Sequence, residues 1–193
     1  MGRVKQYDEA EVLQKAMLTF WENGYENTSV RTLEKNMGIN QFSIYKSFKN
    51  KRTLYEKVLN SYTQKLHKEF LYRLKQEDSN LEDIALFLNN FASQILDKKI
   101  PNCCLMVQST TNLEKYDEQL RQVVLDFFES MKRLFVKALV NSKQVGLLPN
   151  NAPIDLSAEY LIGIAQSISV YAKVKNKTEV RAYIDFAINR LKQ

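Results

Sequence analysis

Several residue types are scarce in this chain of 193 residues, and each scarcity excludes a class of protein. Five glycines and three prolines are too few for a β-rich chain with many tight turns or for flexible linkers. The two cysteines are adjacent, at positions 103 and 104, so they cannot form a disulfide framework. No apolar run approaches the roughly 20 residues that a membrane-spanning helix needs. We therefore expect a folded helical chain that does not enter a membrane.

Histidine occurs once, at position 67. Nucleophilic and general-base mechanisms usually need an oriented histidine or a set of carboxylates, and one His on a charged helix offers little. A protein metal site needs three or four ligands, and the sequence has no glycine-rich phosphate loop. We expect neither an enzyme nor a protein that holds a metal or another cofactor.

The beginning of the chain and its composition indicate where the protein works. Residues 1–7 are short and polar, and no apolar stretch follows them, so they lack the pattern of a secretory signal peptide. We therefore expect a cytoplasmic protein. Since 45% of the residues are hydrophobic, the length suits one or two small domains with a real core.

The positive charge is concentrated in one segment. The net charge is +6, and residues 41–60 carry +4 of it, with five basic side chains against the single acid Glu56. The rest of the chain is nearly balanced. A positive field confined to one segment is typical of a surface that contacts DNA.

Residues 28–52 have the pattern of two short helices joined by a tight turn. Thr28 is a suitable N-cap for the first helix, and Asn40 for a second helix over residues 41–48. Gly38 suits the positive φ at which a helix often ends. The buried faces are expected to be Val30, Leu33 and Met37 in the first helix, and Ile44 and Phe48 in the second. This is the spacing of a helix-turn-helix, whose second helix enters the major groove of DNA.

An amphipathic helix over residues 8–22 is expected to pack on these two and complete a three-helix domain. Trp21, near its end, is expected in the core, with a ligand contact as the alternative. A cluster of four cations (Lys46, Lys49, Lys51 and Arg52) follows the turn and is well placed for phosphate oxygens.

The second helix and its surroundings carry side chains suited to a DNA duplex. Base contacts are assigned to Gln41, Phe42, Ser43 and Lys46. Gln can pair bidentately with adenine, and Phe can meet a thymine methyl group. Phosphate contacts are assigned to Thr28, Tyr45, Ser47, Lys49 and Lys51. In the alternative interpretation, Phe42 belongs to the core and the lysines form a solvated surface.

This segment resembles the DNA-binding domain of the TetR family of bacterial transcription regulators, over about a quarter of the chain. The matching positions are Asn23, Gly24, Tyr25, Thr28, Ser29, Val30, Leu33, Gly38, Ile39, Asn40, Ser43, Ile44, Tyr45, Phe48, Lys51, Arg52 and Leu54. Gln41 and Phe42 stand where the family often has a basic residue and Gly, and Ser47 where an aromatic or His is common. These departures lie on the helix that reads bases, so they concern which operator is bound.

The resemblance implies an all-α protein with a helix-turn-helix DNA-binding domain over residues 1–50 and a larger helical regulatory and dimerisation domain over residues 51–193. A long helix from about residue 50 to 76 would connect them, and a single bundle built on that helix is the alternative. The segment 102–111 also resembles a Gly-Cys-Leu-Leu-Val-Asn-like segment of one TetR subgroup, with Cys104 on the family's Cys. The implied function is that of a repressor, released from a palindromic operator when a small hydrophobic ligand shifts the population of conformations.

Further helices are expected over residues 81–96, 103–111, 117–142, 155–174 and 178–191. Aromatic and Met side chains on them suit a hydrophobic effector pocket, although each alone is more often plain core: Leu66, Phe70, Phe87, Phe91, Met106, Phe127, Met131 and Ile164. Buried structural cysteine is the expectation for Cys103 and Cys104, and thiol sensing is the alternative.

The helix over residues 155–174 is apolar nearly all round, so it must be covered on several sides. A second copy of the chain can supply that cover, and two reading helices related by a two-fold axis read a palindrome. We assign the homodimer interface to Tyr160, Gly163, Ser167, Tyr171, Ile184 and Ile188. The remaining rival, an inert helical interaction protein, gives no reason for a capped turn followed by four cations.

Overall fold

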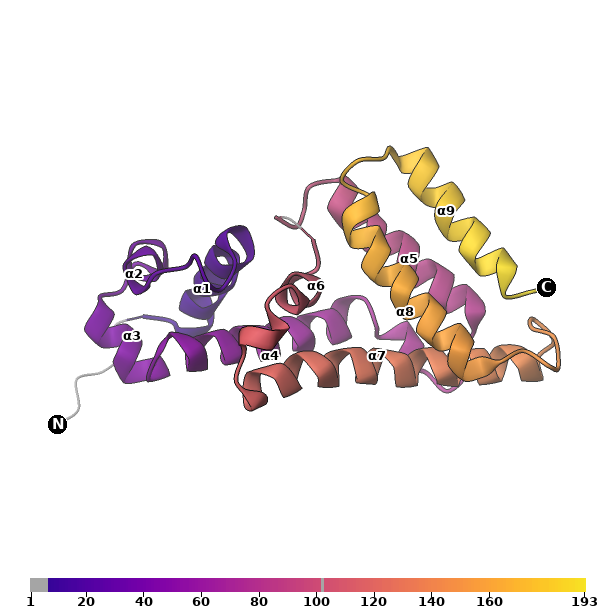
Figure 1. Cartoon of the computed structure of the whole chain (residues 1–193), viewed down its shortest axis with the longest axis horizontal. Coiled ribbons are helices and arrows are strands. Elements are labelled where there is room, and N and C mark those ends of the chain that lie inside the picture. Colours follow the sequence, from indigo (N-terminus) through magenta and orange to yellow (C-terminus); the bar gives the residue numbers. More distant parts are fainter. Residues whose placement is uncertain (1–6, 102) are drawn as a thin grey trace.

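The computed structural model describes residues 7–101 and 103–193. Residues 1–6, part of the segment without a signal-peptide pattern, and Asn102, where the short resembled segment begins, lie outside the described residues. The regular elements of the described residues are all helical, which confirms the all-α class. In Figure 1, α1–α3 gather at one end, α4 runs into the body, and α5–α9 form the larger part.

The N-terminal unit consists of α1 (Glu9–Asn23), α2 (Val30–Met37) and α3 (Gln41–Phe48). Gly38 ends α2 in the left-handed conformation, with φ 71°, and Asn40 caps α3 by accepting from the Ser43 backbone N–H. These two features confirm the expected turn, because they fix both the end of one helix and the start of the next.

The expected cap of α2 was wrong by one residue. Ser29 is the N-cap, and its hydroxyl accepts from the Thr32 backbone N–H at 3.0 Å. Thr28 is buried, and its hydroxyl donates to the Gly24 carbonyl at 2.6 Å. Both residues are good caps in isolation, so the sequence could not separate them. The fold decides, because it turns Thr28 into the loop that follows α1.

The helix expected from about residue 50 to 76 is shorter than predicted. α4 covers Lys51–Glu69 and is capped by Asn50 as expected. The backbone N–H groups of Phe70 and Leu71 both donate to the Leu66 carbonyl, which ends the helix. After this turn Leu71 and Leu74 are buried, Leu74 within the 3-10 turn η1 (Arg73–Lys75). A straight helix would have carried these leucines along its own axis, whereas the turn places both in the core.

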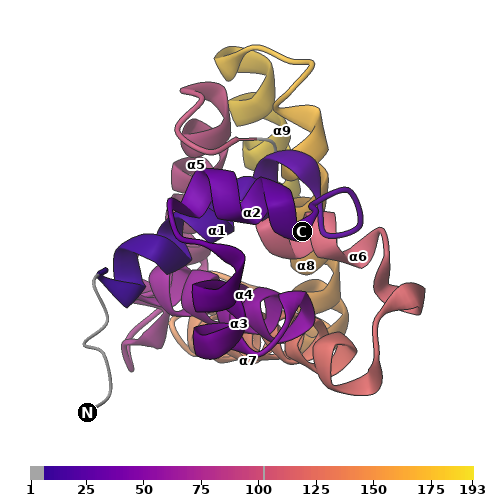
Figure 2. The ribbon, with the colours of Figure 1, turned by 90° about the vertical axis from the view of Figure 1, so that its left-hand side faces the viewer.

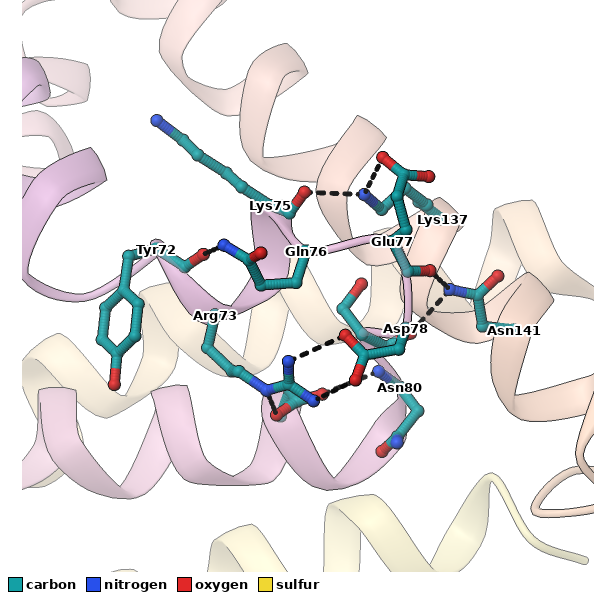
Figure 3. A network of polar contacts seen from close by, with 11 residues as sticks. Tyr72, Arg73, Lys75, Gln76, Glu77, Asp78, Asn80, Lys137 and Asn141 are labelled. Carbon is teal, nitrogen blue, oxygen red and sulfur yellow. Dashed lines mark hydrogen bonds and ion pairs between the residues drawn. The ribbon is translucent and has the colours of Figure 1, made fainter.

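A polar network fastens the segment that replaces the end of that helix (Figure 3). The Arg73 guanidinium donates to both carboxylate oxygens of Asp78, at 2.8 and 3.0 Å, and to Asp83 at 2.8 Å. The Asn141 amide, from the helix Glu118–Gln144, donates to the Glu77 carbonyl at 2.6 Å and the Ser79 carbonyl at 2.9 Å. The loop between α4 and α5 is therefore held from both sides.

The larger part contains α5 (Leu81–Leu96), α6 (Leu105–Thr110), the 3-10 turn η2 (Leu113–Lys115), α7 (Glu118–Gln144), α8 (Ile154–Tyr171) and α9 (Lys177–Arg190). α7 packs on α8 and on α4, and α5 packs on α9. The buried apolar side chains form one continuous cluster that runs from α1 through α4 to α9. α4 packs on α1 and α3 as well as on α6 and α7, so it contributes to the core of both parts.

Ser142 joins α7 to the start of α5, and we expect its loss to be costly. Its buried hydroxyl accepts the Leu81 backbone N–H at 2.7 Å and donates to the Ala138 carbonyl at 2.6 Å. The Leu81 N–H is one of the donors that a helix start leaves without a partner in the helix. Ser142→Ala would leave the Leu81 N–H without a hydrogen-bond acceptor, so the free energy of unfolding should fall by about 1–3 kcal/mol in urea denaturation.

Ser130→Ala is the matched control on the same helix. The Ser130 hydroxyl donates to the Phe127 carbonyl of α7 and is half-buried. Its removal leaves no amide of another helix unpaired, so we expect a change below about 0.5 kcal/mol. Equal losses in the two variants would mean that the bond to Leu81 contributes nothing.

Candidate DNA interface and ligand cavity

α3 lies at the end of the molecule away from α9 (Figure 1), and Figure 2 views that end. Ile44 and Phe48 are buried, while Gln41, Phe42, Tyr45 and Lys46 are exposed. Phe42 is 76% exposed, so the alternative that placed it in the core is wrong. α3 therefore buries one face in the N-terminal unit and leaves the side chains assigned to base edges in solvent, where a DNA groove could reach them.

The side chains at the start of α3 are held in position. Glu34 of α2 accepts the Gln41 backbone N–H at 3.1 Å, and the Gln41 amide donates to the Tyr45 hydroxyl at 3.4 Å. Ser43 and Ser47 are half-buried, and Ser47 shares a 2.5 Å hydrogen bond with the Tyr7 hydroxyl. The assignment of Thr28 to a phosphate is corrected, because its buried hydroxyl is used inside the fold.

The cations after the turn fall into two groups. Lys46 and Lys49 are exposed, and Lys49 ends α3 with φ 64°. Lys51 is half-buried, with its ammonium 4.4 Å from the centre of the Tyr25 ring. Burial lowers the pKa of Lys51, and the nearby Glu26 carboxylate partly opposes that shift. Lys46 and Lys49 are thus the more accessible of the assigned lysines.

Arg52 does not belong to either group, because its guanidinium binds residues of the larger part, a contact that the sequence pattern did not reveal. Its guanidinium donates to both Asp117 carboxylate oxygens, at 2.6 and 2.8 Å, and to the Gln119 side-chain oxygen at 3.0 Å. It also pairs with Glu56 one turn along α4. Asp117 is the N-cap of α7, so this pair connects the first turn of α4 to the first turn of α7.

The Arg52 guanidinium is also the main reason that the pKa of the Asp117 carboxyl is lowered from 3.8 to about 2. A carboxyl with a depressed folded-state pKa stabilises the fold above its ordinary pKa, and this contribution disappears as the pH falls through the lowered value. The bridge is therefore fully charged at neutral pH and is lost only in strong acid.

Aromatic rings join the two parts next to that bridge. Tyr25 of the α1–α2 loop lies 4.7 Å from Tyr55 of α4 and 5.6 Å from Tyr116, which precedes α7, between ring centres. The buried Tyr55 hydroxyl shares a 2.8 Å hydrogen bond with Ser109 of α6. The N-terminal unit therefore contacts the segment before α7 directly through Tyr25 and is linked to α6 through Tyr55 of α4, so displacement of either would reach it.

A small cavity lies in the larger part, with a volume of about 20 Å³. Its lining includes five of the eight residues that the sequence assigned to an effector pocket: Leu66, Phe87, Phe91, Phe127 and Met131. Leu71, Cys104, Val107, Phe128, Ala165 and Gln166 complete the lining. This volume holds little more than a water molecule, so any larger ligand requires the walls to move.

The other three pocket assignments have different places. Phe70 lines a neighbouring cavity, and Met106 and Ile164 are buried side chains of the core. The sequence could not separate Met106 and Ile164 from the cavity lining, because a helical stripe shows which residues are inside but not which of them border a void.

Both cysteines are buried, as expected for structural residues, and burial raises the pKa of both thiols. The Tyr62 hydroxyl donates to the Cys104 sulfur at 3.5 Å. The Trp21 indole N–H donates to the Cys103 carbonyl at 2.5 Å, so the expectation that Trp21 is buried is confirmed. His67 is half-buried, and burial lowers its pKa.

The residues assigned to a dimer interface divide into three groups. Tyr160 and Gly163 of α8 are exposed, and Ser167 and Tyr171 are half-buried. Ile184 and Ile188 are buried inside the chain, where α9 packs on α5, so their assignment to the interface is corrected. The apolar stripe of α9 that the sequence showed faces its own core, and its exposed side carries Phe186 instead.

Two further properties of the described residues bear on partners. Among residues 7–101 and 103–193, His, Cys, Asp and Glu side chains form no group of three or more that could hold a metal ion. No helix in the same part of the chain combines the length and apolar character needed to cross a membrane.

Comparison with known proteins identifies relatives of the chain. Residues 12–58 match the family model described as bacterial regulatory proteins, tetR family. The HTH-type transcriptional repressor ComR of Escherichia coli (strain K12) is 27% identical over 173 residues, which is 89% of this chain and 82% of ComR. The HTH-type transcriptional regulator YezE of Bacillus subtilis (strain 168) is 27% identical over 194 residues, covering 99% and 100%.

A solved structure shares the fold over almost the whole chain. It is a cysteine mutant of the TetR family regulator CifR, complexed with 26-bp double-strand operator DNA. The TM-score is 0.84 at 23% identity, with 97% of this chain and 98% of the other covered. The similarity therefore extends beyond residues 12–58 to the arrangement of the larger helical part.

Proposed function

This chain belongs to the TetR family of DNA-binding transcriptional regulators, and from that premise we propose that it is a homodimeric, cytoplasmic repressor. In the proposed mechanism it binds a palindromic operator through α3, and a small apolar ligand releases it. The supporting observation is the uncovered α3 surface, with Phe42 76% exposed beside Gln41.

The proposed reading surface uses Gln41, Phe42 and Lys46 for base edges, with Ser43 behind them. Tyr45, Lys49 and Lys51 would contact phosphates, Lys51 after leaving the Tyr25 ring. Ser47 is kept in this group as a residue that orients α3, since it shares a hydrogen bond with Tyr7. Phosphate contacts position such a helix, whereas base contacts give it sequence preference.

The proposed dimer uses the exposed sides of α8 and α9. Exposed or half-buried α8 residues recur at alternating steps of four and three: Leu156, Tyr160, Gly163, Ser167 and Val170. This is the spacing of a seam between packed helices. Phe186 and the half-buried Tyr171 and Tyr183 flank the stripe. Two copies joined there would present two α3 helices to half-sites one helical turn, or roughly 34–36 Å, apart.

The proposed ligand site is the cavity between α4, α5, α7 and α8. Its lining of Phe, Leu and Met side chains favours an apolar molecule. Since the cavity holds only about 20 Å³, ligand binding would require a different packing of its walls, and a ligand that prefers that packing would lower the affinity for DNA.

Selection of binding sites from random duplexes tests this function. We expect purified protein to enrich a palindrome with half-sites about one turn apart, and a gel shift on that duplex to weaken steeply as salt rises. Enrichment of no sequence, together with salt-independent retention, would contradict the proposal. Enrichment of an unpaired half-site would contradict only the dimeric part.

The Arg52–Asp117 bridge gives a prediction with an informative sign. Asp117→Asn removes a negative charge, so simple electrostatics predicts tighter DNA binding. If the bridge instead holds the N-terminal unit in its binding orientation, the operator Kd should rise about two- to fivefold, the scale of an exposed ion pair. Asn preserves the α7 cap, because Asn and Asp cap helices equally well.

Glu56→Gln is the matched control, since it removes the other acidic partner of Arg52 but lies on the same helix. We expect an unchanged or slightly lower operator Kd. The measurement is fluorescence anisotropy with labelled operator at pH 6 and pH 8. The Asp117→Asn effect should be the same at both values, because the pKa of Asp117 is about 2. Tighter binding by both variants would show that the bridge does not position the unit.

A further inference from the structure

A second cavity, of about 50 Å³, adjoins the first at the junction of the two parts of the molecule. We call it the outer compartment and the first cavity the inner compartment. The outer compartment is lined by residues of α1, α4, α5 and the segment before α6: Trp21, Tyr62, Lys65, Leu66, Glu69, Phe70, Phe91, Gln94 and Ile100. Trp21 belongs to the N-terminal unit, so this compartment is bordered by both parts.

Two side chains separate the compartments. Leu66 and Phe91 line both cavities and are almost completely buried. Because both cavities border the same two side chains, we infer that a change of rotamer at Leu66 and Phe91 would join them. The joined space would run from Phe127 and Met131 in the core to Trp21 at the junction.

The two ends of that space differ in chemistry. The inner lining is apolar except for Gln166. The outer lining adds three polar side chains, Lys65, Glu69 and Gln94, and the first two are exposed. Lys65 and Glu69 are one turn apart on α4 and carry opposite charges, so the pair gives the outer compartment no electrostatic preference for a cationic or an anionic ligand. The Gln94 amide can both donate to and accept from a neutral polar group.

We propose that both compartments together bind an elongated amphipathic molecule with an apolar body and a single uncharged, hydrogen-bonding end. The apolar body enters the inner compartment past Leu66 and Phe91, and the polar end stays beside Gln94 in the outer compartment. Binding itself does not depend on the proposed repressor function, whereas its effect on DNA does.

The outer compartment also gives the ligand a direct contact with the N-terminal unit. Trp21 packs edge-on against Tyr62, with ring centres 5.0 Å apart, and its indole N–H donates to the Cys103 carbonyl. A ligand that pushes on the indole therefore acts at once on α1, on α4 and on the segment leading into α6. α1 packs on α2 and α4, and both of these helices pack on α3, so a displacement of α1 reaches the helix that carries the proposed reading surface.

The chain provides its own reporter, because Trp21 is its only tryptophan. The probes are straight-chain primary alcohols from 1-butanol to 1-decanol, titrated while Trp21 fluorescence is followed. We expect a saturable change and a Kd that falls about fourfold per added methylene, the ratio that ~0.8 kcal/mol gives. Decanol should bind more tightly than decanoate or decylamine, because the polar end is neutral.

Ala165→Leu tests whether the inner compartment receives the far end of the chain. Ala165 lines the inner compartment only. The added side chain should raise the Kd of 1-decanol tenfold or more and leave the Kd of 1-butanol unchanged. Ala10→Leu, at an exposed position of α1 that lines neither compartment, is the control and should change neither. Circular dichroism checks that both variants fold.

Three results would overturn the proposal: no saturable fluorescence change with any alcohol, a Kd independent of chain length, or decanoate binding more tightly than decanol. A gel shift with the selected operator is read separately. If 1-decanol gives a saturable change in Trp21 fluorescence but leaves operator binding unchanged, the proposed ligand site is supported and the proposed release from DNA is wrong. If no operator is bound at all, the fluorescence titration still decides the site.

Discussion

Val170→Asp is expected to turn the protein into a monomer and to reduce operator affinity at least about 100-fold, because one α3 helix alone contacts too few bases. Val170 is 60% exposed in the stripe of α8 that the proposed dimer buries. Placing an unpaired carboxylate in an apolar contact costs far more than the contact gains. Analytical ultracentrifugation across a concentration series, followed by anisotropy with the full palindrome, measures both effects.

Val145→Asp makes the same substitution at a valine of similar exposure, 67%, at the end of α7 and outside the α8–α9 stripe. It should remain dimeric and bind DNA as the unaltered chain does. Two monomeric variants would show general damage to the fold. Two dimeric variants would place the interface elsewhere, and the half-site spacing would then need another explanation.

Gln41→Ala is expected to raise the Kd for the selected operator roughly 5- to 150-fold, since a well-made base contact contributes about 1–3 kcal/mol of discrimination. The loss should be concentrated at one base pair, where the variant no longer distinguishes adenine from the other bases. Gln41 is exposed and belongs to no core, so the free energy of unfolding should stay within about 0.5 kcal/mol.

Gln14→Ala, on an exposed position of α1, is the matched control and should leave affinity and specificity unchanged. The measurement is a panel of operators with single base-pair changes, titrated against each variant. An equal loss of affinity for every operator in the panel would show that Gln41 contacts the DNA backbone and not a base. No loss would remove it from the interface and leave Phe42 and Lys46 as the remaining base-edge candidates.

The amino-acid sequence alone determined the helix-turn-helix, because its signals are local. Gly38 at positive φ, Asn40 as a cap, and Ile44 and Phe48 at helical spacing all act within a few residues. The same holds for α5, whose bounds Leu81–Leu96 follow from a strong apolar period between two polar breaks. The match to the tetR family model also lies in this region, over residues 12–58.

Choices between neighbouring residues of equal local quality depended on the rest of the fold. Thr28 and Ser29 are both good N-caps, and only the loop geometry buried one and exposed the other. The end of α4 at Glu69 is another case, because the residues after it could continue a helix. Only the gain from burying Leu71 and Leu74 against other elements favours the turn.

Tertiary structure alone decided which buried and charged groups meet. Periodicity shows that Ile184 and Ile188 lie on an apolar face, but not that α5 covers this face while Phe186 is left to solvent. Likewise, Arg52 follows three lysines along the chain, and only the approach of α7 pairs it with Asp117. A helix period is set by the backbone of one segment, whereas a void, an ion pair or an uncovered face is a property of several segments brought together.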